Sequence, residues 1–204
     1  MTQTEPVDTI NSKNQRKGRA IFLMMLTFFV VPIIAVVLMF KFNFKPAGES
    51  RGELITPPKL IQTIATLKDS NGKDSHEFWV EKWNMVYVTD QCEVECMAKL
   101  RDMRQIHVSL YKDIPRTQRV LITNVQDLSR IKKDFPDLTV INQPAGDIKA
   151  LSSQFDFGGE NALQSNRLYL VDPLGHIMMS YPTNTHAADI RKDLVRLLKY
   201  SWAA

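Results

Sequence analysis

The residues best suited to chemistry in this sequence are Cys92 and Cys96, its only two cysteines. They enclose the motif CEVEC and follow an apolar, strand-like run, MVYV, at residues 85–88. Two thiols four residues apart at a strand-to-helix junction can form a disulfide or share a soft metal ion. The functional question is which of these two uses applies.

A long apolar segment lies near the N-terminus. Residues 20–40 contain no charged side chain, and at about 1.5 Å per residue they span roughly 30 Å, the thickness of the hydrocarbon core of a bilayer. A cleaved signal peptide would have a shorter apolar region, about 7 to 15 residues, followed by a small-residue cleavage site. The run is instead followed by KFNFK. We therefore expect one retained transmembrane helix that contains Pro32.

The flanking charges predict the orientation of this anchor. Basic residues are more numerous before the run than just after it: Lys13, Arg16, Lys17 and Arg19, then Lys41 and Lys45. Because basic flanks stay on the cytoplasmic side, we expect a single-pass protein of the inner (cytoplasmic) membrane. Its N-terminus would lie inside and its C-terminal domain in the periplasm. Without the N-terminal tail the chain has 22 basic and 20 acidic residues, so nucleic-acid binding is not expected.

The composition predicts one folded domain behind the anchor. Hydrophobic residues make up 44% of the sequence, which suits a globular core in a chain of this length. Residues 41–58 contain three prolines and two glycines, the composition of a linker. The expected organisation is a cytoplasmic tail (1–19), an anchor (20–40), a linker (41–58) and a folded domain (59–204).

Strand and helix patterns alternate within this domain. Strands are expected at residues 64–67, 85–89, 119–123, 138–141, 167–172 and 177–181. Helices are expected at residues 92–107, 127–135, 148–154 and 187–200. This order, ending in a hairpin and a helix, predicts an α/β fold of the thioredoxin-like sandwich type.

The cysteine pair also has a plain structural interpretation, a disulfide that stabilises an exported domain. A disulfide that closes so short a loop removes little chain entropy, however, so stability is a weak reason to keep it. A helix N-terminus would lower the pKa of the Cys92 thiol, whereas the nearby Glu93 and Glu95 carboxylates disfavour a further negative charge. We therefore expect Cys92 and Cys96 to be functional, as a dithiol less acidic than those of strongly oxidising proteins.

Four segments of the sequence resemble the Sco (SenC-type) family of membrane-anchored copper chaperones for cytochrome c oxidase. They are ATLKDSNGK (65–73), WNMVYVTDQCEVEC (83–96), RVLITNV (119–125) and RLYLVDPLG (167–175). The resemblance covers about residues 60–200, and the N-terminal anchor fits it. It implies a thioredoxin-like fold, copper as the metal, and a cytochrome c oxidase subunit or its copper chaperone as the partner.

The resemblance also implies a set of copper ligands, formed by the two cysteines and one histidine. That histidine lies nine residues before the proline of the late D-P-x-G turn, and counting back from Pro173 gives Gln164. Two thiolates alone suit Cu(I), whereas Cu(II) prefers imidazole among its ligands and an amide oxygen is a poor substitute. A Cu(I) site formed by Cys92 and Cys96 therefore stays open as one alternative, without the three-ligand Cu(II) site of the family, and the missing histidine favours redox or accessory work over stable copper storage.

The sequence contains four histidines that are alternatives for the missing ligand. His186 follows the last predicted strand, so it is the one retained as a candidate metal ligand, with a surface histidine before a helix as the alternative. His176 would lie roughly 25 Å away at the far end of a strand. His107 would lie about 15 Å along the helix, and it and His76 are expected to be solvated.

Two functions of different classes remain open, with a third, simpler interpretation. The first is an assembly factor of the oxidase that handles Cu(I) through Cys92 and Cys96 or docks with a copper chaperone. The second is a thiol-disulfide oxidoreductase whose Cys92 attacks a disulfide and whose Cys96 resolves the mixed disulfide. The third is a docking scaffold without catalysis. Motifs of hydrolases and nucleotide-binding proteins, such as HExxH, GxSxG and the Walker loop, do not occur in the sequence.

Overall fold

The structure, a computed structural model, describes residues 7–41, 50–62, 78–142 and 145–200. The chain forms two units, residues 1–49 and residues 50–204, and each is described by itself. The strand expected at residues 64–67 lies outside the described residues, as does His76.

The first unit contains helix α1, Val7–Lys41. Its segment Ile21–Met39 has a mean hydropathy of 3.0 and is the one helix in the described part of the chain that is long and apolar enough to cross a membrane. This agrees with the membrane anchor predicted from the sequence. The helix also extends back into the basic segment that was expected to be a tail.

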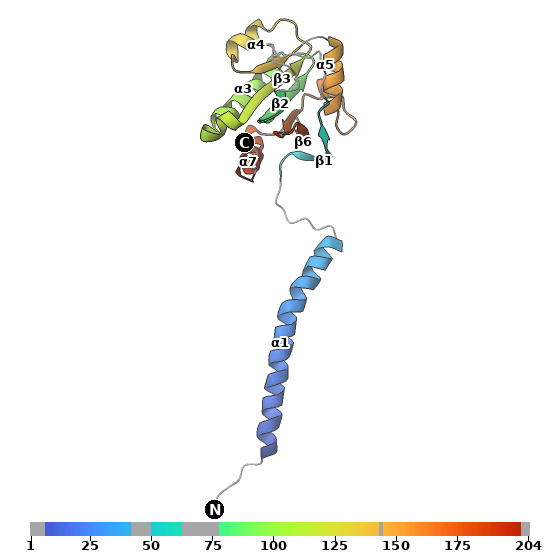
Figure 1. Ribbon diagram of the computed structural model, residues 1–204, viewed down its shortest axis with the longest axis vertical. Helices are drawn as coiled ribbons and strands as arrows, with labels where there is room; N and C mark the ends of the chain where they lie inside the picture. Colours follow the sequence, from blue (N-terminus) through green and yellow to red (C-terminus); the bar gives the residue numbers. More distant parts are fainter. Residues whose placement is uncertain (1–6, 42–49, 63–77, 143–144, 201–204) are drawn as a thin grey trace, which may run out of the picture. The chain divides into compact units, whose positions relative to one another are not determined.

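The second unit is a six-stranded mixed sheet with helices on both faces (Figure 1). Its strands are β1 (Glu53–Leu60), β2 (Trp83–Thr89), β3 (Thr117–Thr123), β4 (Thr139–Ile141), β5 (Leu168–Val171) and β6 (His176–Tyr181). Its helices are α3 (Val94–Val108), α4 (Ser129–Asp134), α5 (Ala145–Ser152), α6 (Ala162–Ser165) and α7 (Ala187–Tyr200), with 3-10 turns η1 (Tyr111–Arg116) and η2 (Ser153–Phe155). The predicted thioredoxin-like α/β fold is confirmed.

The sheet has the order β1-β6-β5-β2-β3-β4, so β2 is one of its inner strands. β2 pairs in parallel with β3 and antiparallel with β5. All seven residues of β2 are buried, as expected for a strand that is covered on both faces. The chain leaves the carboxyl end of this strand at Thr89, and the cysteine motif follows.

Alternate side chains of β2 enter two separate cores. One face packs against α3 and α7, and this core includes Met85, Tyr87, Leu100, Met103, Ile190 and Leu194. The other face packs against α5, and this core includes Val86, Val88, Ile148, Leu151, Phe155 and Tyr169. Figure 1 shows α3 and α7 on one side of the sheet and α5 on the other. Cys96 belongs to the first of these cores, and Cys92 packs against it.

The folded unit begins at Ser50, earlier than the start near Leu60 expected from the sequence. Most of β1 lies inside the segment expected to be a linker, and β1 pairs with β6 at the edge of the sheet. Its register shifts between Leu54 and Lys59, where Pro57 and Pro58 lie. An edge strand tolerates prolines because one side of its backbone needs no partner, and this is why a proline-rich segment can still be a strand.

Candidate functional site

Cys92 and Cys96 form a disulfide, with their Cα atoms 4.9 Å apart. Helix α3 begins at Val94, and Glu93 at its N-cap has non-helical backbone angles of φ −100° and ψ −147°. Cys92 therefore precedes the helix, and Cys96 lies in its first turn. The sequence predicted a helix from about Cys92, two residues too early, because a residue in the N-cap position leaves the helical conformation.

Cys92 and Cys96 differ in their exposure to solvent. Cys96 is 3% exposed and belongs to the core formed with α3 and α7. Cys92 is only partly buried and packs against the edge of that core. Cys92 is therefore the cysteine that a partner can reach, while Cys96 is held in place by packing.

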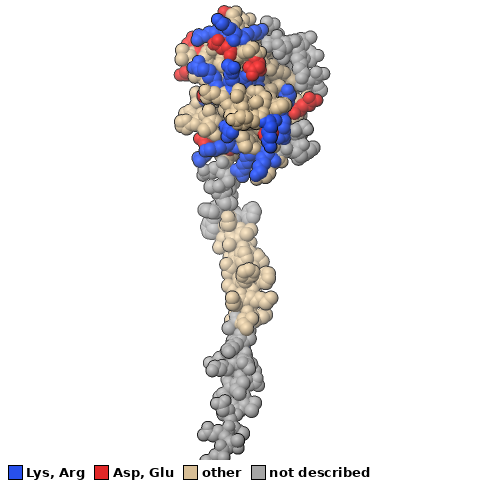
Figure 2. Space-filling model, turned by 90° about the vertical axis from the view of Figure 1, so that its left-hand side faces the viewer, with Lys and Arg blue, Asp and Glu red and all other residues tan. Residues whose placement is uncertain are grey.

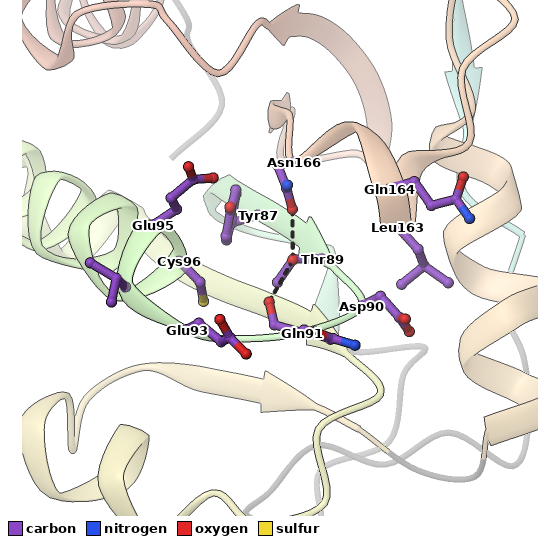
Figure 3. A pocket seen from close by; sticks show the side chains of 11 residues that line it. Tyr87, Thr89, Asp90, Gln91, Glu93, Glu95, Cys96, Leu163, Gln164 and Asn166 are labelled. Carbon is purple, nitrogen blue, oxygen red and sulfur yellow. Dashed lines mark hydrogen bonds between the residues drawn. The ribbon is translucent and has the colours of Figure 1, made fainter.

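A pocket of about 550 Å³ lies beside the disulfide (Figure 3). Three segments form it: the carboxyl end of β2 with the loop that follows, the first turn of α3, and α6 with the residue after it. Its lining residues are Tyr87, Thr89, Asp90, Gln91, Glu93, Val94, Glu95, Cys96, Leu163, Gln164 and Asn166. A strand end, a helix start and a loop thus converge on Cys96.

Gln164 lies in the wall of this pocket, so the position that the family resemblance assigns to the third ligand is at the cysteine site. In Figure 3, Gln164 lies on the far side of Thr89 from Cys96. Thr89 Oγ donates a hydrogen bond of 2.7 Å to Asn166 Oδ1, which closes this part of the pocket. Gln164 therefore shares the pocket with the disulfide, with Thr89 and Asn166 between them.

Hydrogen bonds at its start fix the four-residue helix that carries Gln164. Asn161 caps α6 by accepting from the Leu163 N–H at 3.0 Å, and Asp156 Oδ1 accepts from the Ala162 N–H at 2.8 Å. The Asp90 N–H donates to the Leu163 carbonyl at 2.9 Å and joins α6 to the loop before the cysteines. Such local caps can stabilise a helical turn that is too short to be stable through its own backbone hydrogen bonds.

None of the histidines in the described part of the chain lines the pocket. His186 is exposed, and its carbonyl accepts from the Asp189 and Ile190 N–H groups at the start of α7. His176 Nδ1 lies 3.1 Å from a carboxylate oxygen of Asp172. His107 is partly buried, where the sequence suggested a solvated residue, and burial lowers the pKa of its imidazole.

The donors at the site suit a soft ion bound by two thiolates. In the ranges that the structure describes, no group of three or more His, Cys, Asp and Glu side chains is arranged to hold a metal. Two thiolates, which reduction of the Cys92–Cys96 disulfide would provide, are ligands that Cu(I) favours. The amide of Gln164 and the nearby carboxylates provide oxygen atoms, which are weak ligands for Cu(I).

The wall of the pocket is acidic. Asp90, Glu93 and Glu95 line it, and its eleven lining residues include no Lys, Arg or His. Burial raises the pKa of the Tyr87 phenol to about 12, and the charge of Glu95 acts in the same direction. Tyr87 is therefore neutral at physiological pH, and the charge at the pocket comes from carboxylates.

This charge leads to a prediction about the disulfide. The double substitution Glu93→Gln and Glu95→Gln should make the pair easier to reduce, because it removes negative charge beside the thiolates of the reduced state. For two solvent-exposed carboxylates we expect the reduction potential to rise on the order of 20 mV, measured by equilibration with glutathione buffers. Glu81→Gln, a matched change before the other end of β2, should leave the potential unchanged. A fall in the potential of the double variant would contradict the prediction.

Sequence reasoning identified the cysteines and Gln164 but missed the other walls of the pocket. Thr89 and Asp90 end a buried strand, and ligand sites often form at the carboxyl ends of strands, so their position was a usable signal. Asn166 carried no such signal. It is a left-handed residue with φ 50° after a four-residue helix, and its contact with Thr89 joins residues 77 positions apart.

Comparison with known proteins supports the fold. Residues 83–201 match the family model described as the transmembrane-like, thioredoxin-like, C-terminal domain. No curated protein matches the sequence.

Several solved structures share the fold. Apo Sco1 from Thermus thermophilus is 17% identical, with a TM-score of 0.59 over 75% of this chain and 99% of that one. ScoI from Arabidopsis thaliana, solved with copper bound, is 17% identical, with a TM-score of 0.55 over 74% and 99%. BsSco, described as having a disulfide switch and as a member of the Sco family of cytochrome c oxidase assembly proteins, is 16% identical, with a TM-score of 0.53 over 73% and 100%. The predicted resemblance to Sco proteins is thus confirmed in the fold.

Proposed function

The chain belongs to the transmembrane-like, thioredoxin-like C-terminal domain family, and on that premise we propose that it is a membrane-anchored, Sco-like protein that assists the assembly of cytochrome c oxidase. The working group in this proposal is the Cys92/Cys96 pair. The observation that carries it is a disulfide with one accessible cysteine, at a pocket that also contains Gln164. The Sco proteins of the same fold, solved with copper or described with a disulfide switch, support it.

In the first form of this proposal the reduced pair handles copper as cargo. Two thiolates bind Cu(I) well, and Cu(I) needs no further ligand. The partly buried Cys92 gives a partner thiolate access to the ion, while the buried Cys96 holds the second position. The partner would be a cytochrome c oxidase subunit or the copper chaperone that serves it. His186 remains a proposed additional ligand only if the loop before α7 approaches the cysteines.

The second form is thiol-disulfide exchange, which the disulfide itself favours. The reduced Cys92 thiolate attacks a disulfide of a copper-site subunit, forming a mixed disulfide and expelling one partner thiolate. The Cys96 thiolate then attacks Cys92 Sγ, which forms the intramolecular disulfide and releases the second partner thiolate. The partner gains two electrons and two protons, this chain loses them, and a dithiol reductant must restore the pair.

The place of the protein in the cell follows from the anchor in this proposal. Helix α1 fits a single-span membrane anchor, and the basic N-terminal flank supports an N-terminus on the cytoplasmic side. The domain that carries Cys92 and Cys96 would then face the periplasm, where disulfides persist. We propose the inner membrane as its location on these grounds.

One experiment separates the two forms from a scaffold without chemistry. The full chain in detergent is reduced, titrated with Cu(I) against a competing chelator, and in parallel equilibrated with redox buffers to measure its reduction potential. Retention of one Cu(I) per chain that is lost in Cys92→Ser supports copper handling. An exchange-active potential without Cu(I) retention supports the oxidoreductase. A protein that neither retains Cu(I) nor has an exchange-active potential would overturn the proposal, and only a docking scaffold would remain.

The position of Gln164 allows a further prediction about copper. Replacing Gln164 with His should tighten binding of Cu(II) to the reduced protein by roughly tenfold or more, because an imidazole replaces a weak amide ligand at the same pocket. Optical titration with Cu(II) would measure this, through the thiolate-to-copper absorption. Ser165→His, a change at the next position of α6, which does not line the pocket, is the matched control. Equal effects of the two substitutions would contradict the assignment of Gln164 to the third ligand position.

A further inference from the structure

Glu93 and Glu95 place two carboxylates inside the cysteine motif, each next to a cysteine in the chain. Both residues are exposed and line the pocket at the disulfide. Figure 3 shows their side chains on opposite sides of Cys96. A partner sulfur that reaches Cys92 therefore comes close to both carboxylates, because one is on the adjacent residue and the other lines the same pocket.

No cation of the domain neutralises these two charges. In the part of the chain that the structure describes, neither Glu93 nor Glu95 forms an ion pair or a side-chain hydrogen bond. The basic residue that follows them most closely in the chain is Lys99, and its ammonium donates to the Thr183 carbonyl at 3.0 Å. The charge of both glutamates is therefore available to a partner.

The acidic charge is local to the pocket. Its third carboxylate, Asp90, accepts from Asn124 Nδ2 at 2.6 Å, and this amide carries no charge. Elsewhere on the domain basic side chains are abundant: Figure 1 places α3, α4 and α7 on the left-hand side, and Figure 2 shows that side, where Lys and Arg are more numerous than Asp and Glu. A cleft that is lined by charges of one sign raises the local concentration of ligands of the opposite sign.

An apolar side chain accompanies the two carboxylates. Val94 lies between them in the chain, is the first residue of α3 and is 80% exposed. The pocket beside it has a volume of about 550 Å³, which is in the size range of sites that bind small ligands. A partner segment at Cys92 can therefore place a side chain in the pocket and contact Val94, with the carboxylates on either side.

We propose that disulfide exchange at Cys92 selects partner segments that carry Lys or Arg beside their cysteines, and that Glu93 and Glu95 determine this selection. The inference rests on the proposed function in its thiol-disulfide exchange form. The Cys92 thiolate attacks one sulfur of the partner disulfide, a mixed disulfide forms, and one partner thiolate leaves. The Cys96 thiolate then attacks Cys92 Sγ and releases the second partner thiolate, so the partner gains the two electrons and two protons that this chain loses. In the mixed disulfide the neighbours of the attacked sulfur lie beside both glutamates, and opposite charges there favour the encounter.

Exchange rates with charged peptide disulfides test the selection. The probes are symmetrical disulfide dimers of three tripeptides that differ only in a Lys, Gln or Glu beside the cysteine. The full chain in non-ionic detergent is reduced, mixed with each dimer at low ionic strength, quenched by alkylation and analysed by mass spectrometry. Relative to the Gln dimer, we expect Glu93→Gln with Glu95→Gln to lower the rate with the Lys dimer roughly threefold or more and to raise the rate with the Glu dimer. The Gln dimer corrects for a change in reactivity of the cysteine pair that affects all three dimers alike, and high salt should remove the differences between them.

A matched variant shows whether the effect belongs to the cysteine motif. Glu81→Gln removes one carboxylate before the other end of β2 and should leave all three rates unchanged, whereas Glu93→Gln and Glu95→Gln should each lower the rate with the Lys dimer. Equal changes with the three dimers overturn the selection and leave the exchange reaction in place. No reaction with any dimer overturns the exchange reaction itself, and the selection with it.

Discussion

A chain with Cys96→Ser should capture disulfide partners through Cys92 and fail to release them. Cys92 is the accessible cysteine and Cys96 is 3% exposed within the core, so the first attack belongs to Cys92 and the second step to Cys96. Without Cys96 the mixed disulfide cannot be resolved within the chain. With an aromatic disulfide as the probe, we expect the reduced wild-type chain to release two thiolates per molecule, and the variant to release one and keep the adduct.

The matched single variant makes this result specific. Cys92→Ser leaves only the buried Cys96, and its rate with the same probe should be roughly tenfold lower or less, because thiol reactivity follows access and thiolate character. Cys96→Ala serves as a second variant without Cys96. Circular dichroism of each variant verifies that its substitution does not unfold the domain. Equal rates for the two single-cysteine chains would contradict the assignment of Cys92 as the attacking residue.

The Asp193→Ala substitution should be the most destabilising change among those near the start of the domain. Asp193 is 5% exposed, and one of its oxygen atoms accepts from the Arg51 and Gly52 N–H groups and from Tyr181 O–H at 3.1 Å. Removing the carboxylate leaves buried donors without an acceptor, at a cost of about 3 kcal/mol. For a domain of this size the unfolding midpoint should fall by about 10 °C, measured by circular dichroism of the full chain in detergent.

Two milder substitutions separate the parts of this network. Tyr181→Phe removes one donor and should cost only about 1 kcal/mol, and Asp193→Asn keeps an acceptor oxygen and should lie between the two. The network also explains a glycine. A Cβ atom on Gly52 would lie 2.6 Å from the Tyr181 ring, so no larger residue fits there without displacing that ring. A loss below about 1 kcal/mol for Asp193→Ala would contradict this account.

The sequence predicted the inner strands well because their composition follows from burial. β2 and β3 contain buried apolar runs at residues 85–88 and 120–122, and such runs are recognisable without any partner information. β1 was missed because Pro57 and Pro58 argue against a strand unless its position at the sheet edge is known. The order of strands and helices therefore identified the fold, and the edge of the sheet had to come from the structure.

The sequence predicted the candidate residues of the site but not the shape of the pocket around them. The type and spacing of Cys92 and Cys96 make them candidates without further information. The family resemblance identified Gln164 as the position of the third ligand. The pocket depends on α6, a helix of four residues, which is too short to show a periodic pattern. Its acidic wall arises because the loop after β2 and the first turn of α3 meet that helix. Contacts between segments that are distant in the chain cannot be predicted from the local sequence.

The reduction potential of the Cys92–Cys96 disulfide tests the central claim most directly. The full chain would be equilibrated with glutathione or dithiol buffers, trapped by alkylation and analysed by mass spectrometry. A functional pair should have a potential between about −120 and −270 mV, the range of exchange-active dithiols, whereas structural disulfides lie below about −300 mV. A value in the first range agrees with a working dithiol, and a value below about −300 mV would contradict it and make the pair a structural disulfide.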